Sequence, residues 1–267
     1  MTRLITQWIS TMEDTATCWN KTLQEKTGMG YIDLAAKVSG NSKEDIKAAS
    51  KTCKVAVVPI TAGLGTIDTF SKSVAAIPTA MGFETFITTA SDVSGILEAY
   101  EKNAEIIYMA DDDRYIALNI KNNKIGENNF ATANGFIEVL EALGGTLSGQ
   151  DALVLGYGIV GQTMAKALAK KSAKVTVYDK NSRKDLLIKS DGYKVLGSIE
   201  AMSSFKYVAD ATSEGPWITK DMLNEEAVLA APGIPFSLDG SAKAKFADRY
   251  VHDLLEIGTA VMLGLAI

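Results

Sequence analysis

A glycine-rich turn after a buried strand is the feature that most constrains the fold of this chain. The segment ALVLGYGIVGQTMAKALAKKSAKVTVYD contains Gly156-x-Gly158-x-x-Gly161 directly after an apolar run and at the start of a helical pattern. In a Rossmann unit the first glycine allows the tight turn, the second leaves room for a pyrophosphate, and the third lets helix and strand pack closely. The helix start also offers free N–H groups to phosphates. The pattern therefore predicts a dinucleotide-binding domain.

An acid at the end of the next strand indicates which dinucleotide is bound. Asp179 stands where a carboxylate accepts hydrogen bonds from the ribose hydroxyls, and it would repel a 2′-phosphate, so the sequence favours NAD over NADP. Lys180 and Arg183 follow closely and are either cofactor contacts or the solvated start of a helix. The loops DATSEG and AAPGIP end two later strands and either line the cofactor crevice or are ordinary turns. The predicted cofactor-binding residues are Gly156, Tyr157, Gly158, Ile159, Val160, Gly161, Asp179, Lys180, Arg183, Thr212, Ser213, Pro232 and Gly233.

Short β-branched runs alternate with longer helical patterns along the whole chain, which is typical of α/β proteins with parallel sheets. A glycine-rich break at 144–149 separates two such series. The predicted fold class is α/β, with an N-terminal α/β substrate domain over 1–135 and a C-terminal Rossmann NAD-binding domain over 136–255, joined by a linking helix. A C-terminal helix over 256–267 is a candidate to pack back on the first domain. Strands are predicted at 54–60, 85–89, 105–110, 151–156, 173–179, 207–212, 226–233 and 249–254, and helices at 67–81, 92–103 and 131–143.

Composition narrows the class of protein further. The chain has 267 residues, of which 47% are hydrophobic and 22% charged, as in ordinary globular proteins. A net charge of −5 argues against nucleic acid as a partner, and no apolar run reaches the roughly 18 residues of a membrane span. Cys18 and Cys53 form no CxxC pair, and the N-terminus lacks a signal-peptide pattern, so we expect a cytoplasmic protein without a membrane partner. If the chain forms an oligomer, we expect a homodimer, which is the commonest assembly of soluble proteins.

The chain contains one histidine, His252, and this limits the available chemistry. Ser-His-Asp catalysis and histidine-rich metal sites would depend on that residue alone. We therefore predict no metal site. His252 itself is either a structural residue or a catalytic group.

Two segments of the first domain offer candidate substrate contacts. PITAGLGTIDTF places Thr61 and two glycines between a strand and a helix, where bare N–H groups hold a substrate carboxylate or form a plain turn. Phe70, one turn into that helix, is either core or a cavity wall. In KIGENNF, Asn128 either orients a substrate amine or caps the linking helix. The N-terminal apolar stripe that includes Leu4 and Ile5 is either a lid or a docked helix.

Three consecutive acids follow the apolar strand EIIYMA. Asp111, Asp112 and Asp113 could hold a metal, face water or bind a cationic substrate. If the extended geometry persists, Asp111 and Asp113 point to one side and Asp112 to the other. We predict that Asp111 faces the crevice and binds a substrate ammonium, and that Asp112 and Asp113 are solvated or paired with Arg114.

Several stretches together resemble the pyrrolysine synthase family. They are VVPITAGLGTIDTFSKSV, FITTASDVSG, EIIYMADDDRYIALNIKNNKIGENN, the glycine fingerprint, VLAAPGIP and LEIGTAVM, and they span the chain from about Val57 to its end. The resemblance implies NAD-dependent oxidation of the terminal primary amine of L-lysine-Nε-(3R)-methyl-D-ornithine. The imine is then hydrolysed with loss of ammonia, and the aldehyde condenses with the methylornithine α-amine to close the pyrroline ring of L-pyrrolysine.

The resemblance also implies roles for individual residues. Asp111 in MADD matches an acid that contacts the substrate, and Asn128 in GENN matches a polar residue at the reacting end, so these two are the catalytic candidates. Phe70 matches a cavity aromatic, and Asp253 matches an acid that precedes IGTA, although its side chain is shorter. Leu4 or Ile5 matches a mobile N-terminal helix. With Thr61, these residues complete the predicted substrate site.

Without the resemblance, two other functions fit the residues. One is a dehydrogenase of the methylene-tetrahydrofolate or shikimate type, which pairs a small α/β domain with a Rossmann domain and typically uses a lysine in the first domain's cleft. No lysine directly follows the strand that ends at the three acids. The other is a dinucleotide-sensing protein without catalytic activity, in which the substrate cleft would lack convergent polar groups.

Overall fold

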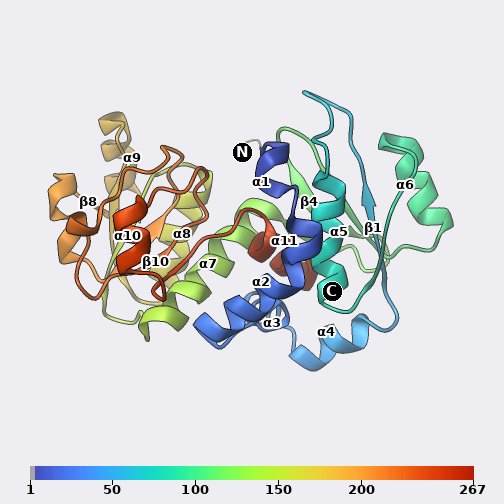
Figure 1. Cartoon of the computed structure of the whole chain (residues 1–267), viewed down its shortest axis with the longest axis horizontal. Coiled ribbons are helices and arrows are strands. Elements are labelled where there is room, and N and C mark those ends of the chain that lie inside the picture. Colours follow the sequence, from blue (N-terminus) through green and yellow to red (C-terminus); the bar gives the residue numbers. More distant parts are fainter. Residues whose placement is uncertain (1–3) are drawn as a thin grey trace. The chain divides into compact units, whose positions relative to one another are not determined.

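A computed structural model describes residues 4–267, and the chain divides into two compact units (Figure 1). One unit contains the chain up to Gly135 together with Leu254–Ile267, and the other contains Phe136–Asp253. The boundary falls inside one long helix, α7 (Asn128–Gly144). Both units are α/β, as predicted.

The first unit is built on a five-stranded sheet with the order β2-β1-β3-β4-β5. Its strands β1, β2 and β3 are parallel, and four consecutive residues of β1 are buried, as expected for a strand covered by helices on both faces. β4 and β5 extend the sheet in antiparallel fashion. The strands are β1 (Lys54–Val58), β2 (Glu84–Ile87), β3 (Ile106–Ala110), β4 (Tyr115–Asn119) and β5 (Ile125–Glu127), and the helices are α1 (Thr6–Ile9), α2 (Met12–Thr27), α3 (Tyr31–Ser39), α4 (Lys43–Ala49), α5 (Phe70–Ala80), α6 (Asp92–Glu101) and α11 (Glu256–Ala266).

The hairpin β3–β4 was not predicted from the sequence, and it changes the position of the three acids. The Asp111 N–H donates to the Arg114 carbonyl at 2.8 Å, so Asp112 and Asp113 form the tip of a two-residue turn. The prediction that these acids alternate along an extended strand was therefore wrong. The burial of β4 does alternate, in a period-two pattern over YIALN.

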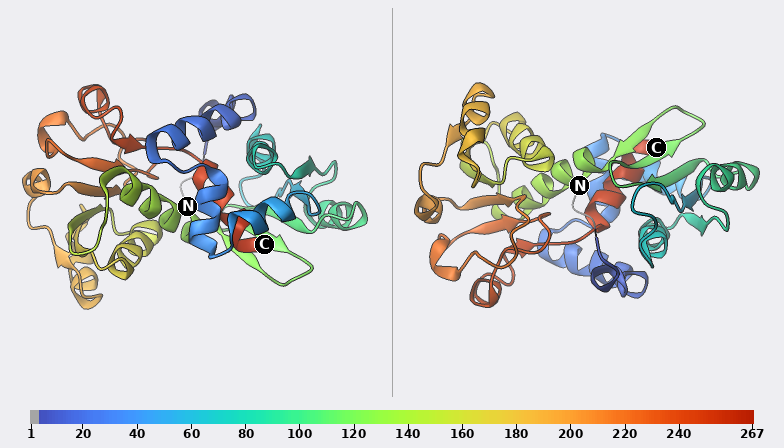
Figure 2. Two further views of the ribbon diagram at one scale, coloured as in Figure 1. Left: turned by 90° about the horizontal axis from the view of Figure 1, so that it is seen from below. Right: turned by 90° about the horizontal axis from the view of Figure 1, so that it is seen from above.

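The C-terminal helix α11 packs into the first unit. All but one of its eleven residues are buried, and it lies against α3, α5 and the β4–β5 hairpin (Figure 2). A methyl group added at Gly264 would lie 2.8 Å from the Ala35 carbonyl oxygen of α3, and one added at Gly126 of β5 would collide with the Met262 backbone of α11. Thr259 accepts a 2.8 Å hydrogen bond from Tyr108 at its carbonyl and shares a 2.7 Å bond with Tyr115 at its hydroxyl. Small residues thus let the last helix approach its neighbours closely.

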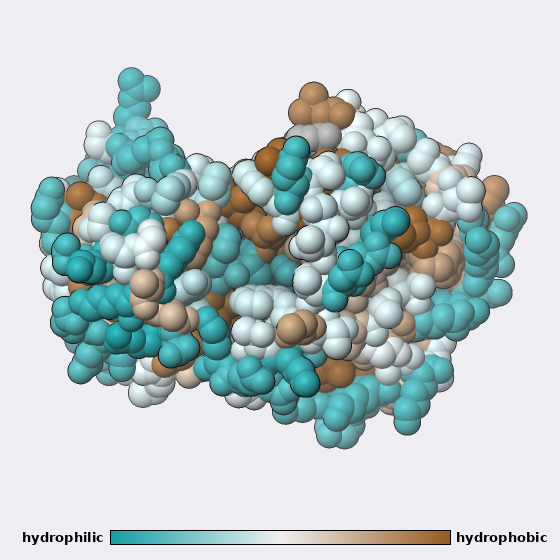
Figure 3. All heavy atoms as spheres, viewed as in Figure 1, coloured by the Kyte–Doolittle hydropathy of each residue, from teal (hydrophilic) through white to brown (hydrophobic). Residues whose placement is uncertain are grey.

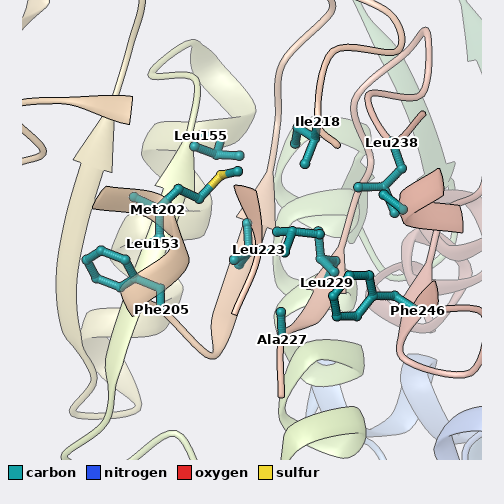
Figure 4. Close-up of a cluster of buried hydrophobic side chains, with 12 residues drawn as sticks. Leu153, Leu155, Met202, Phe205, Ile218, Leu223, Ala227, Leu229, Leu238 and Phe246 are labelled. Carbon is teal, nitrogen blue, oxygen red and sulfur yellow. The ribbon is translucent and has the colours of Figure 1, made fainter. Parts of the chain in front are cut away.

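The second unit has a six-stranded parallel sheet with the order β11-β10-β9-β6-β7-β8. Counted from its first strand, this is the 3-2-1-4-5-6 order of a Rossmann domain. One face buries a cluster that includes Leu153, Phe205, Leu229 and Phe246 (Figure 4). The elements are β6 (Asp151–Leu155), α8 (Ile159–Lys170), β7 (Lys174–Tyr178), the 3₁₀ turn η1 (Ser182–Lys184), α9 (Asp185–Ser190), β8 (Lys194–Val195), η2 (Ile199–Ser204), β9 (Tyr207–Asp210), η3 (Lys220–Met222), β10 (Val228–Ala230), α10 (Gly240–Lys245) and β11 (Tyr250–Val251).

On the face shown in Figure 3, hydrophobic side chains form separate groups among hydrophilic ones. Val93, Leu97 and Tyr100 of α6 are among the exposed large apolar residues. Within residues 4–267, no helix combines the length and the hydrophobicity required to cross a bilayer.

The close approach of α11 to α3 predicts a stability difference between two helical glycines. Gly264→Ala should lower the free energy of unfolding by about 1–3 kcal/mol, because its methyl group would push against the α3 backbone. Gly240→Ala in α10 is the matched control, since a methyl group there meets no atom within 4 Å, and it should be neutral or slightly stabilising. Urea denaturation measures both variants. Equal stability of the two would contradict the tight packing of α11.

Candidate functional site

The glycine turn after β6 has the geometry that a bound pyrophosphate requires. Gly156 adopts φ +83°, a conformation that favours glycine, and its N–H donates to the Tyr178 carbonyl at 2.7 Å. A side chain at Gly161 would collide with the Gly156 carbonyl oxygen, whereas a methyl group at Gly158 would meet no atom within 4 Å. Gly158 is also the N-cap of α8, and no side chain caps this helix end, so the helix N-terminus is accessible to an anion beside Gly158. The turn fits a dinucleotide phosphate.

Asp179 lies beside this turn and is heavily hydrogen-bonded. One carboxylate oxygen accepts from the Tyr157 N–H at 2.7 Å and from the Lys184 ammonium at 2.8 Å, and the other accepts from the Asn181 N–H at 2.9 Å. Partial burial works to raise the pKa of Asp179, but the Lys184 hydrogen bond and the two N–H donors outweigh it and the pKa is lowered. The acid is therefore a carboxylate at neutral pH, held next to the glycine turn.

The remaining predicted cofactor residues differ in which of their groups could contact a dinucleotide. The Tyr157 side chain is buried and donates to Asp191 at 2.7 Å, so only its backbone lies at the turn. Lys180 pairs with Glu214 at 2.6 Å. Arg183 is exposed and contacts the Asn181 side chain through its backbone N–H. Ile159 and Val160 form the first turn of α8.

The loops after β9 and β10 are joined by hydrogen bonds to Asp210, the last residue of β9. The Thr212 N–H and hydroxyl both donate to one oxygen of Asp210, and the Gly233 N–H donates to the Asp210 carbonyl at 3.2 Å. A side chain on Gly233 would run into the Thr212 backbone. Ser237 contacts the other oxygen of Asp210, which is fully buried, and burial raises the pKa of this acid. Buried Asp210 thus ties together the loops that carry Thr212, Ser213, Pro232 and Gly233.

In the first unit, two acids hold the loop after β1. Asp92, at φ +53°, accepts from the Thr61 N–H at 2.8 Å and from its hydroxyl at 2.6 Å, and these bonds lower the pKa of Asp92. Asp112 accepts from the Leu64 N–H at 2.7 Å. The sequence left open whether this loop binds a substrate carboxylate or forms a plain turn. At Leu64 the N–H is bound by a carboxylate of the chain itself. The prediction that Asp112 is merely solvated or paired with Arg114 is therefore wrong.

Asp111 begins the hairpin turn and is exposed. One of its carboxylate oxygens accepts from the N–H groups of Arg114 at 2.7 Å and Asp113 at 2.8 Å, and these two bonds lower its pKa. The turn therefore orients an ionised carboxylate at the end of β3. Two donors on one oxygen leave acceptor capacity on the other.

Sheet register places Asn128 at the same edge as Asp111. Ala110 pairs with Tyr115, and Ile116 pairs with Glu127, so the residues that follow β3 and β5 lie on either side of the start of β4. Two strand spacings separate them, roughly 10 Å. The Asn128 side-chain oxygen accepts from Thr132 at 3.1 Å and lies close to Gly258 of α11, where a methyl group would come within 2.8 Å of it.

Phe70 joins the same region through aromatic contacts. Its ring meets Tyr115 edge-on at a centroid distance of 5.8 Å, and Tyr115 in turn bonds Thr259. The N-terminal segment is held on α5, the helix that Phe70 begins: the Ser73 hydroxyl donates to the Ile9 carbonyl at 3.1 Å. Leu4 is buried and Ile5 is exposed, and both precede α1.

Glu256 is a candidate that the sequence prediction missed. The predicted acid, Asp253, is buried at the end of the second unit, but Glu256 directly precedes IGTA and begins α11. Only 7% of Glu256 is exposed, and it accepts the N–H groups of Leu254 and Leu255 at 3.3 and 3.1 Å. Burial raises its pKa above the ordinary 4.5. A single acid at the start of an otherwise apolar helical segment was the available signal. Within the part of the chain described here, no group of three or more His, Cys, Asp or Glu side chains is placed to hold a metal.

Comparison with solved structures places the fold among Rossmann-type dehydrogenases. Shikimate dehydrogenase from Aquifex aeolicus matches with a TM-score of 0.53 over 80% of this chain and 90% of its own, at 15% identity. The methylenetetrahydrofolate dehydrogenase/cyclohydrolase FolD from Campylobacter jejuni matches with a TM-score of 0.52 over 87% and 93%, at 16% identity. The fold class is that of a two-domain dehydrogenase.

Sequence relatives define the family within this class. Pyrrolysine synthase from Methanosarcina acetivorans is 34% identical over 82% of this chain and 85% of the relative. Pyrrolysine synthase from Methanosarcina barkeri is 33% identical over 90% and 89%. The family described as "Pyrrolysine biosynthesis protein PylD, N-terminal domain" matches residues 9–126. The chain belongs to the pyrrolysine synthase family, which makes it an enzyme of pyrrolysine biosynthesis.

The Asp112 contact predicts local protection of the loop after β1. Asp112→Ala should speed amide hydrogen exchange at Leu64 by about tenfold, because a hydrogen bond to a charged acceptor is lost. Asp113→Ala, at the neighbouring turn position, is the control and should leave that exchange unchanged. Hydrogen exchange followed by mass spectrometry gives both rates. Equal protection in the two variants would show that Asp112 does not hold the loop.

Burial of Glu256 predicts a pH dependence of stability. Because its folded-state pKa is raised, the folded state holds the proton more tightly than the unfolded state does, and stability is lost as pH rises from the unfolded pKa through the folded one. Glu256→Gln cannot lose that proton, so its stability relative to the parent chain should increase from pH 4 towards neutrality. Urea denaturation at several pH values measures the difference. A difference that stays constant with pH would refute the raised pKa.

Proposed function

We propose that this enzyme oxidises the terminal primary amine of L-lysine-Nε-(3R)-methyl-D-ornithine with NAD and so produces L-pyrrolysine. The observation that carries the proposal is the identity of 33–34% with two pyrrolysine synthases over most of both chains. The glycine turn supports it, because its open N-cap and its neighbouring carboxylate suit a dinucleotide with a free adenosine ribose.

The proposed reaction proceeds in three steps. Oxidation converts the CH₂–NH₂ group to CH=NH, and NAD accepts the hydride while a proton is released. Water then adds to the imine and ammonia leaves, which gives the semialdehyde. The α-amine of the methylornithine part condenses with this aldehyde, loses water and closes a five-membered ring that contains the C=N bond.

The first step requires the reacting amine to be neutral. A hydride leaves readily only from a carbon whose nitrogen lone pair stabilises the developing iminium, and a primary amine has a pKa of about 10. A carboxylate paired with the reacting nitrogen would keep the proton on it. The ionised acids of the site are therefore better suited to the other ammonium groups of the substrate, which they hold by charge-assisted hydrogen bonds.

We assign this positioning role to Asp111. Its turn leaves one oxygen with spare acceptor capacity, and burial is slight, so the carboxylate stays charged. Asn128 has no charge and suits the reacting end, because an amide orients an amine without fixing a proton on it. Phe70, packed on Tyr115, supplies an apolar surface for the methylene chain. Thr61, Leu4, Ile5 and Asp253 complete the proposed substrate contacts.

In the second unit we assign the pyrophosphate to the glycine turn and the first turn of α8, and the adenosine ribose to Asp179. The loops fixed by Asp210, which carry Thr212 and Gly233, lie at the carboxyl ends of β9 and β10, where nicotinamide binds in this fold. We further expect a cytoplasmic enzyme that acts on a small molecule and forms a homodimer.

Asp111→Ala tests the substrate assignment. Loss of the ammonium contact should raise KM for the lysyl-methylornithine substrate at least tenfold or abolish turnover, since a charged hydrogen bond is worth about 1.5–3 kcal/mol. Affinity for NADH should not change, because Asp111 belongs to the first unit. The reaction is followed by the absorbance of NADH at about 340 nm and by the mass of the product.

Asp113→Ala removes a neighbouring acid of the same turn and is the matched control, for which KM should stay within about twofold of the parent value. A similar KM increase in both variants would mean that general charge, and not the Asp111 carboxylate, attracts the substrate. Loss of NADH affinity in Asp111→Ala would place this residue in the cofactor site. Binding of NAD without turnover of the substrate by the parent enzyme would defeat the proposed function.

A further inference from the structure

The hydrogen bonds of Asp179 leave too few acceptor positions for a ribose. A carboxylate offers about four lone-pair positions. Tyr157, Lys184 and Asn181 already donate to three of them. The 2′- and 3′-hydroxyls of an adenosine ribose bring two further donors, so at least one present donor has to move when the ribose binds.

Two of the three donors are fixed in the backbone. The Tyr157 N–H lies in the glycine turn, which is anchored by the bond from the Gly156 N–H to the Tyr178 carbonyl. The Asn181 N–H lies in a turn that its own side chain closes by accepting the Arg183 N–H at 3.2 Å. Lys184 is the only side-chain donor among them, and 35% of its side chain is exposed at the end of a flexible stem.

Lys184 also differs from the neighbouring basic residues. The Lys180 ammonium is paired with Glu214 on the loop after β9. Arg183 approaches this network through its backbone N–H. Of these three basic residues, only Lys184 places its side-chain cation on the carboxylate that would bind the 2′-hydroxyl, and a 2′-phosphate on that ribose would come next to it.

We propose that Lys184 is a specificity-determining residue of the dinucleotide site, which competes with the ribose hydroxyls for Asp179 and attracts a 2′-phosphate. This proposal rests on the proposed function only in that the second unit binds a nicotinamide dinucleotide. Asp179 alone would discriminate strongly against NADP by charge repulsion. With Lys184 beside it the pair is nearly neutral, so discrimination between NAD and NADP is weaker than the acid alone would give.

Binding of NADH and NADPH to the full chain, measured by titration calorimetry without substrate, tests this role. Lys184→Ala should increase the ratio of Kd for NADPH to Kd for NADH by about tenfold, because it frees an acceptor for the ribose and removes the cation next to the phosphate. Asp179→Asn should lower that ratio below the parent value, and Lys184→Ala in the Asp179→Asn background should restore most of the discrimination against NADPH. Lys189→Ala, which removes an exposed lysine of α9 that is not among the predicted cofactor contacts, is the matched control and should change the ratio by less than about twofold.

The outcomes separate this proposal from the proposed function. An unchanged or lowered ratio in Lys184→Ala, with NADH binding retained, would overturn the role of Lys184 and leave the enzyme assignment intact. The same ratio change in Lys189→Ala would also overturn it, because general charge would then explain the effect. Failure of the parent chain to bind either dinucleotide would overturn both proposals.

Discussion

The first unit depends on the burial of α11, the last helix of the chain. Small residues let it approach α3 and β5 closely, and Thr259 bonds two buried tyrosines of the sheet. The same helix begins with Glu256 and places Gly258 against Asn128. Packing and site geometry therefore have one origin: the residues that close the core of the first unit also define the surroundings of Asn128 and, through Tyr115, of Phe70.

Carboxylates that bind backbone N–H groups recur in both units. Asp92 and Asp112 hold the loop after β1, Asp111 orders its own turn, and Asp179 accepts an N–H of the glycine turn. Each such bond fixes a loop at the carboxyl end of a strand, where α/β proteins bind ligands. Several acids that look like ligand contacts in the sequence thus also serve to shape the chain. Asp111 retains acceptor capacity for a ligand, whereas Asp179 has too little for both ribose hydroxyls while Lys184 is bound to it.

The features that the sequence predicts well are those that act locally. The three glycines and Asp179 lie within one βαβ unit, so their spacing alone specifies the turn, and the two-domain α/β class follows from alternating patterns. The β3–β4 hairpin was missed because acids that follow an apolar strand are also common at the carboxyl end of a parallel strand, and Asp-Asp is not a typical hairpin turn. The Asp112–Leu64 bond, the Lys184–Asp179 pair and the burial of Glu256 depend on side-chain positions in the folded chain, which residue spacing does not determine.

Transfer of a labelled hydride tests whether the enzyme oxidises the carbon that carries the terminal amine. The substrate is synthesised with two deuterium atoms on the carbon that carries the terminal amine of the methylornithine part, and the enzyme turns it over with unlabelled NAD. We expect one deuterium in the reduced dinucleotide and one in the pyrroline ring of the product, as mass spectrometry would record. Reduced dinucleotide without deuterium, or a product that keeps both labels, would contradict oxidation at that carbon.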